Sequence, residues 1–233
     1  MTDNLTEGAV AKLGVFYPSR AESVMHVLAL RNNPAKLIPE WRETQLLSFA
    51  ELLNTFALDL KRSYEEKRIV TLTWLVRSLY ELSIWVRYCN RAEANARRFS
   101  DDSMRDFYGY CKGLQTILIK RGIDEKHITK LMENFSGFAK LKGVAPLADD
   151  YLRVSEAATA LGEGREYAAQ NKIYSKLAHP TSFALSVAFA HPGENSYLDI
   201  FLLDGVQYAI DALVGIRDFV VILYPEPSSL SLW

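Results

Sequence analysis

Apolar residues recur at the spacing of an α-helix along most of the chain, and the segment 69–88 shows this most clearly. It has two apolar seams, which predicts a helix that contacts neighbours on two sides. One seam contains Arg77 and Glu81, one turn apart. A charge that is removed from water needs a partner, so the pattern predicts a buried, paired Arg and Glu inside a helical bundle. The first seam comprises Val70, Trp74, Arg77, Glu81, Ile84 and Tyr88, and the second comprises Leu72, Leu75, Leu79, Leu82 and Val86.

The same periodicity predicts further helices, and turn signals separate them. The central helix is expected to continue in more polar form to Phe99, and a new helix to begin near residues 100–103. Gly122 suits the left-handed position that follows a helix, and Asp124 suits a helix cap. The expected helices cover residues 19–30, 40–66, 69–88, 100–121, 124–135, 147–161, 165–178, 181–190 and 197–224.

This order of elements predicts the fold class and the domain organisation. No alternating apolar and polar run bounded by turn signals stands out, so almost no sheet is expected. The prediction is an all-α protein: a single antiparallel helical bundle with long central helices and short connecting helices. Residues 1–233 are expected to form one domain, with residues 1–38 loosely attached and residues 225–233 irregular.

Composition limits the classes of partner. Lys and Arg number 27 against 28 Asp and Glu, and this balance counts against nucleic acid as the main partner. The cysteines, Cys89 and Cys111, lack a metal-like spacing and indicate free thiols in a reducing compartment. The polar amino terminus does not resemble a secretory signal, and charges interrupt the two most apolar stretches. We therefore expect a cytoplasmic protein with no membrane association.

Arg77 and Glu81 allow two interpretations. They can form an internal i,i+4 salt bridge that fixes the register of the bundle. Alternatively, Arg77 can present its guanidinium group to an anionic ligand or a phosphate while Glu81 orients it or a nearby histidine. The spacing alone does not separate these interpretations.

A second cluster of candidate residues lies in the segment 174–181, Tyr-Ser-Lys-Leu-Ala-His-Pro-Thr. The proline ends a helix at His179, where free carbonyl groups and the helix dipole favour the protonated imidazole. His179 can therefore cap the helix. It can instead act as a general acid or base, with Tyr174, Lys176 and Thr181 as neighbours.

These two segments together resemble a family. The run Arg77-Ser78-Leu79-Tyr80-Glu81, followed about ninety residues later by the segment 174–180, is similar to the bacterial helical proteins grouped as DUF5677. The resemblance covers about residues 71–186 and implies no established activity. The chain is also loosely similar to HEPN-type helical proteins, many of which are metal-independent ribonucleases or their inactive relatives.

The HEPN resemblance implies an arginine and a histidine separated by four to six residues. Two pairs fit, close to the chance expectation of about one, so a ribonuclease centre would sooner combine Arg77 with His179 across helices. The two pairs are Arg20 with His26 and Arg121 with His127.

Two charged stripes complete the set of candidates. Arg87, Arg91 and Arg98 share one side of the extended central helix and form either a solvated face or a phosphate-contacting stripe. Asp204, Asp211 and Asp218 recur every seven residues on the last helix, too far apart for one metal ion, and are expected to face water or to pair with arginines. No metal site and no cofactor are predicted, because the motifs for zinc, di-iron and nucleotide binding are absent.

Three functions remain open at this point. The first is a bacterial or phage interaction or regulatory module, dimeric or bound to another protein, with Arg77, Glu81 and His179 in a buried polar cluster. Exposed aromatic residues, for which Trp41, Tyr108 and Trp233 are candidates, would mark its interface. The second is a metal-independent endoribonuclease that uses His179 as general acid or base, Arg77 for charge stabilisation, and Tyr174 and Lys176 in support. The third is a pocket for a small anionic ligand, bound by Arg77 and Thr181.

Overall fold

The computed structural model of the chain describes residues 2–32, 38–144, 147, 151–179 and 196–223, and this part is helical without a strand. An all-α fold is therefore confirmed. By its contacts the chain forms two compact units: unit 1 consists of residues 1–91 and 154–233, and unit 2 of residues 92–153. The helices are α1 (Thr2–Asn32), α2 (Glu40–Glu65), α3 (Ile69–Arg91), α4 (Glu93–Lys120), α5 (Lys126–Leu141), α6 (Val154–Leu161), α7 (Gly164–Ala178) and α9 (Ser196–Leu223).

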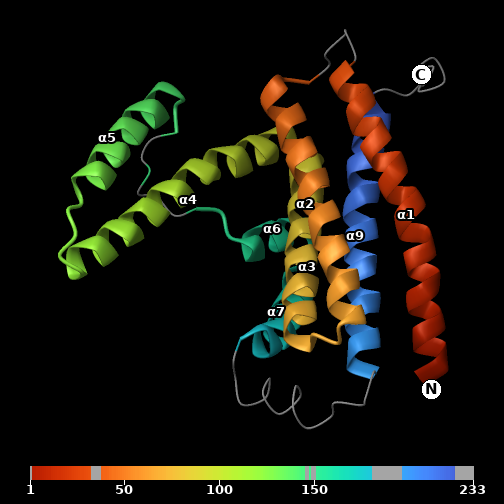
Figure 1. The fold of residues 1–233 in the computed structure, drawn as a ribbon. Helices are drawn as coiled ribbons and strands as arrows, with labels where there is room; N and C mark the ends of the chain where they lie inside the picture. The colour runs from red at the N-terminus through yellow and green to blue at the C-terminus, as the bar shows by residue number, and fades with distance from the viewer. Residues whose placement is uncertain (1, 33–37, 145–146, 148–150, 180–195, 224–233) are drawn as a thin grey trace. The chain divides into compact units, whose positions relative to one another are not determined.

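Unit 1 is a bundle in which α3 and α9 pack against each other and against α2, while α1 packs along α9 (Figure 1). The helix directions differ from the uniformly antiparallel arrangement that was expected. Val76 of α3 approaches Gly205, and Val86 approaches Gly215, so α3 and α9 run parallel. Helix α2 runs antiparallel to both. The parallel pair arises because α4 to α7 separate α3 from α9 in the sequence, and this long connection lets the chain return to the same end of the bundle.

Helix α3 forms the centre of unit 1, and its two predicted seams differ in burial. The leucine-rich seam, Leu72 to Val86, is buried throughout. The other seam is buried only from Ile84 to Tyr88, because Val70 and Trp74 lie on the surface. Arg77 and Glu81 lie between these two parts, with side chains 27% and 26% exposed. The expectation that this pair is buried was therefore wrong.

Helix α3 is also the one helix of the described residues that is long and apolar enough to cross a membrane by length and composition. Over half of its most apolar window is buried inside unit 1, which is the arrangement of a core helix in a soluble protein. The cytoplasmic location itself stays a prediction.

Helix α1 differs from the short helix and loosely attached segment that the sequence suggested. It is continuous through Pro18 and packs along α9, where the buried Ser23 hydroxyl donates to the Leu213 carbonyl at 2.9 Å. Phe16 of α1 is buried as well. Proline removes one backbone donor, and the packing along α9 offsets that loss.

Unit 2 contains α4 and α5, which pack as an antiparallel hairpin. The ring centroids of Phe107 and Phe135 lie 4.8 Å apart, and the Gln115 side-chain amide donates to the Thr129 hydroxyl at 3.0 Å. The predicted left-handed Gly122 is present with φ +66°, and Ile123 donates to the Leu118 carbonyl at 3.0 Å, which closes the end of α4 as a Schellman motif.

The start of α4 differs from the prediction of a helix beginning near residues 100–103. Helix α3 ends at Arg91 and α4 begins at Glu93, because Ala92 is extended. Asp102 lies inside α4, where its buried carboxylate accepts the Leu152 backbone N–H at 2.9 Å and pairs with Arg105. Aspartate is a residue type that often caps helices, but here Asp102 binds the backbone at Leu152 instead. Both cysteines are free, as expected, and both are buried.

Candidate functional site

Arg77 and Glu81 form the ion pair that their spacing predicted. The Arg77 Nε donates to Glu81 Oε1 at 3.0 Å. Tyr167 of α7 lies beside this ion pair. Burial raises the pKa of Tyr167, and the Glu81 carboxylate raises it further. A partly solvated i,i+4 pair contributes only a few tenths of a kcal/mol, about 0.3–0.5. The Arg77 side chain therefore still contacts solvent, but Glu81 already neutralises its charge.

A cluster of tyrosines lies beside this pair, where α3, α7 and α9 meet. The Tyr80 ring stacks on Tyr167 at 6.0 Å between centroids and approaches Tyr208 at 4.7 Å. Tyr174 donates to Asp204 at 2.9 Å and lies 3.3 Å from the Tyr208 hydroxyl, which in turn donates to Gln170. We call Tyr80, Tyr167, Tyr174, Tyr208, Gln170 and Asp204 the tyrosine cluster.

Burial determines the proton affinities in the tyrosine cluster. It raises the pKa of Asp204, although the hydrogen bond from Tyr174 and the charge of Lys12 oppose the rise. Burial also raises the pKa of Tyr174, with Tyr208 and Asp204 adding to the effect. A tyrosine with a raised pKa remains protonated at neutral pH, so Tyr174 serves here as a hydrogen-bond donor. The Tyr80 hydroxyl is buried and has no hydrogen-bond partner in the part of the chain that the structure describes.

The candidate residues of the segment 174–181 differ in burial. His179 is the C-cap of α7, is exposed, and its backbone N–H donates to Ser175. Lys176 is exposed on α7, whereas Tyr174 is buried in the tyrosine cluster. Thr181, Pro180 and the expected helix 181–190 lie outside the described residues. The exposure of His179 contradicts the predicted buried Arg-Glu-His cluster, because α7 ends at Ala178 and the His179 side chain lies on the surface.

The arginines that were proposed to contact phosphates do not share one helix face. Arg87 pairs with Glu163 and donates to the Ser83 carbonyl, and Arg91 donates to the Ala160 carbonyl. Arg98 lies in α4, beyond the break at Ala92. Arg87 and Arg91 therefore join α3 to the segment around α6 and α7, which is a structural role.

The aspartates of α9 also have separate surroundings. Asp211 accepts from Gln207 and Asp218 pairs with Arg217, both on the surface, whereas Asp204 pairs with a tyrosine. Thus the expectation of a solvent-facing or Arg-paired stripe holds at Asp211 and Asp218 and is wrong at Asp204. Among the described residues, no group of three or more His, Cys, Asp or Glu side chains is placed to hold a metal ion.

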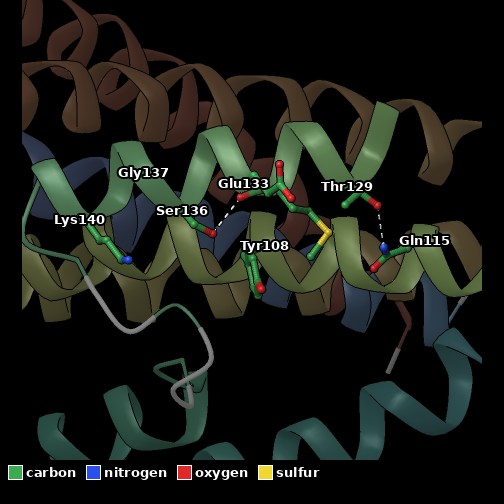
Figure 2. Close-up of a pocket in the computed structure, with 8 residues that line it drawn as sticks. Tyr108, Gln115, Thr129, Glu133, Ser136, Gly137 and Lys140 are labelled. Carbon is green, nitrogen blue, oxygen red and sulfur yellow. Dashed lines mark hydrogen bonds between the residues drawn. The ribbon is translucent and has the colours of Figure 1, made fainter. Parts of the chain in front are cut away.

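Unit 2 carries an open groove of about 440 Å³ between α4 and α5, shown in Figure 2. Most of the residues that line it have polar side chains. Ser136 donates to the Met132 carbonyl at 2.8 Å, and Gln115 donates to Thr129 across the groove. The lining residues are Tyr108, Gln115, Thr129, Met132, Glu133, Ser136, Gly137 and Lys140.

The opposite face of the hairpin is apolar. The buried seam of the hairpin contains Cys111, Met132 and Ala139. Apart from Met132 of the seam and Gly137, the residues that line the groove follow a seam residue by one or four positions or precede one by three. Positions one or four before a seam residue, or three or six after it, therefore lie on the other face of both helices. We call this surface the apolar hairpin face: Phe107, Tyr110, Leu114, Ile117, Leu131, Phe135 and Phe138.

Much of the apolar hairpin face is exposed. Five of its seven residues are between 39% and 67% exposed: Phe107, Tyr110, Ile117, Leu131 and Phe138. Sequence reasoning missed this surface because it treated every periodic apolar stripe as core. A signal was present, since α4 and α5 are amphipathic and a two-helix hairpin offers only one seam for burial. Among the residues named as interface candidates, Trp41 and Tyr108 are half-buried and Trp233 lies outside the described residues.

Comparisons with family models, with curated proteins and with solved structures find no match to this chain. Its function is therefore inferred from its own residues.

Proposed function

We propose that this protein is an all-helical interaction module that binds a protein chain through the apolar hairpin face, while unit 1 serves as a stable scaffold. The observation that carries the proposal is the exposure of Phe107, Tyr110, Ile117, Leu131 and Phe138 on one face of a hairpin. Contiguous apolar surface of this kind marks interaction sites on soluble proteins.

The amount of apolar surface fits a protein interface. The exposed parts of these five side chains sum to on the order of 450 Å², given that a large apolar side chain presents about 200 Å² when fully exposed. A standard interface buries about 800 Å² on each partner, of which somewhat more than half is apolar. The exposed apolar area of the apolar hairpin face is therefore close to the apolar area that one partner contributes to such an interface.

The geometry of the catalytic candidates gives less support to the endoribonuclease. Arg77 is paired with Glu81, and Tyr174 is held by Asp204 and Tyr208. The described residues show no hydrogen bond or ion pair between His179 and either member of the Arg77–Glu81 pair. RNA cleavage in EDTA, lost in both His179→Ala and Arg77→Ala, remains the result that would support a nuclease.

Photo-crosslinking in living cells tests the interaction directly. A photoreactive phenylalanine analogue replaces Tyr110 or Phe138 on the apolar hairpin face. As a matched control it replaces Thr116, which is exposed on the same helix but away from that face. We expect crosslinked species from the first two positions and none from the control. No crosslinks from any position, or equal crosslinks from all three, would overturn the proposed interaction.

A further inference from the structure

We propose that the chain that covers the apolar hairpin face is a second copy of this protein, and that the two hairpins pack face to face as a four-helix bundle about a twofold axis. This inference rests on the proposed function and names its partner. Two paired hairpins are a standard way to enclose a single apolar core between four helices.

The first argument is the spacing of the stripe on α4. Phe107, Tyr110, Leu114 and Ile117 follow one another at intervals of three, four and three residues. This order of intervals reads the same in both directions. An α4 helix that meets an antiparallel copy of itself across a twofold axis can therefore place every residue of the stripe opposite a residue of the partner stripe, as a C2 interface requires.

The second argument is the size of the side chains in that stripe. The aromatic residues, Phe107 and Tyr110, occupy its amino-terminal half, and the aliphatic residues, Leu114 and Ile117, occupy its carboxyl-terminal half. Antiparallel pairing places each aromatic ring opposite an aliphatic side chain of the partner. Larger against smaller side chains fill a core better than a pairing of like with like.

The third argument is charge. Asp106 flanks the aromatic end of the stripe and Arg121 follows its aliphatic end, and both are exposed. Neither side chain forms an ion pair with a described residue. The antiparallel pairing brings Asp106 of each copy to the end where Arg121 of the other copy lies, within reach of a long guanidinium side chain. The twofold axis makes this pair twice.

Sedimentation of the purified full chain over a range of concentrations tests the dimer. We expect the natural chain to dimerise and Tyr110→Glu to raise the dimer dissociation constant about 30-fold or more, since a large side chain at the centre of an interface dominates its affinity. Thr116→Glu adds the same charge on the other side of α4 and should leave the dissociation constant unchanged. Circular dichroism melting confirms that each variant folds, which the exposed positions favour.

A charge exchange tests the antiparallel arrangement. Asp106→Arg and Arg121→Asp should each raise the dissociation constant about fivefold, because each places like charges together twice. The double variant restores opposite charges and should return to within about twofold of the natural chain. A double variant weaker than both single variants would overturn the antiparallel pairing.

The two proposals fail in different ways. A chain that remains monomeric up to about 100 µM, well above the dissociation constants expected for an interface of this area, overturns the second-copy inference. If Tyr110 then still crosslinks to a different protein in cells, the proposed interaction module stands without the dimer. If crosslinks are also absent, both proposals fall.

Discussion

Units 1 and 2 are both helical but differ in how they use their apolar residues. All of the largest fully buried side chains lie in unit 1, on α2, α3 and α9, and they are mostly leucine and isoleucine. The helices of unit 2 bury only Ala96, Asp102, Cys111, Met132 and Ala139, and leave aromatic and aliphatic side chains in water. An apolar periodicity of the same kind thus produced a core in one unit and an exposed face in the other.

The difference follows from the number of neighbours that each helix has. Helix α3 has neighbours on several sides, from α2, α6, α7 and α9, so both of its seams can be covered. Each helix of the hairpin has one main neighbour in its own unit, so only a narrow seam leaves water. Burial of a large apolar side chain contributes about 1.5–3 kcal/mol to the stability of the fold. The side chains on the exposed face of the hairpin do not make this full contribution.

The largest expected effect is a cavity in unit 1. Leu79 is fully buried on α3, so Leu79→Ala should lower the free energy of unfolding by about 3 kcal/mol. The same change at Leu131, which is 42% exposed on α5, should cost less than about 1 kcal/mol. Denaturant titration at concentrations that keep the chain monomeric measures both. Equal costs would mean that the hairpin has a core comparable to that of unit 1.

Adding one methyl group at a glycine of each unit compares how closely the two units are packed. A Cβ at Gly205 of α9 would lie 2.8 Å from two methyl carbons of Leu60 and 3.2 Å from Val76, so Gly205→Ala should destabilise by about 1–3 kcal/mol. A Cβ at Gly113 of α4 meets nothing within 4 Å, and Gly113→Ala should stabilise α4 by about 0.5–1 kcal/mol. Thermal melts of the two variants measure the effects. Destabilisation by Gly113→Ala would show that this side of α4 is also packed.

A further prediction concerns the buried acid of the tyrosine cluster. Asp204→Ala removes the acceptor of Tyr174 and should cost about 1–2 kcal/mol, whereas Asp204→Asn keeps an acceptor and removes the charge that burial disfavours. The pKa of Asp204 is raised in the folded protein, so the stabilising effect of its proton is complete below the unfolded pKa of 3.8 and is lost as pH rises through the folded pKa.

The natural chain should therefore lose stability relative to Asp204→Asn as pH rises from about 4 toward neutrality. Urea titrations of both proteins across this range give the difference in unfolding free energy. A difference that is independent of pH would contradict the raised pKa of Asp204.

Helix boundaries followed closely from the sequence where local chemistry specifies them. Helix α2 was expected at residues 40–66 and α9 at residues 197–224, and both agree with the structure to within one residue. Gly122 took the predicted left-handed conformation, and the Asp124 carboxylate accepts the Lys126 backbone N–H at the start of α5. These features depend on neighbouring residues alone, which is why they can be read from spacing.

The candidate site was less predictable. The Arg77–Glu81 pair was expected from its i,i+4 spacing and is present, but its partial exposure depends on which helices cover that side of α3. The partnership of Tyr174 with Asp204 joins α7 to α9 across thirty positions, and no spacing rule indicates it. His179 was grouped with Tyr174 because the two are close in sequence, yet one is exposed and the other buried.

The sequence by itself determined that this protein is helical, where α2, α7 and α9 begin and end, and which stripes along its helices are apolar. Only the tertiary structure decided which stripes are covered, that α3 and α9 run parallel, and that α4 and α5 pair as a hairpin with one face left in water. The physical reason is that hydrogen bonds, caps and periodicity act within a few residues, whereas burial depends on neighbours that distant parts of the chain supply.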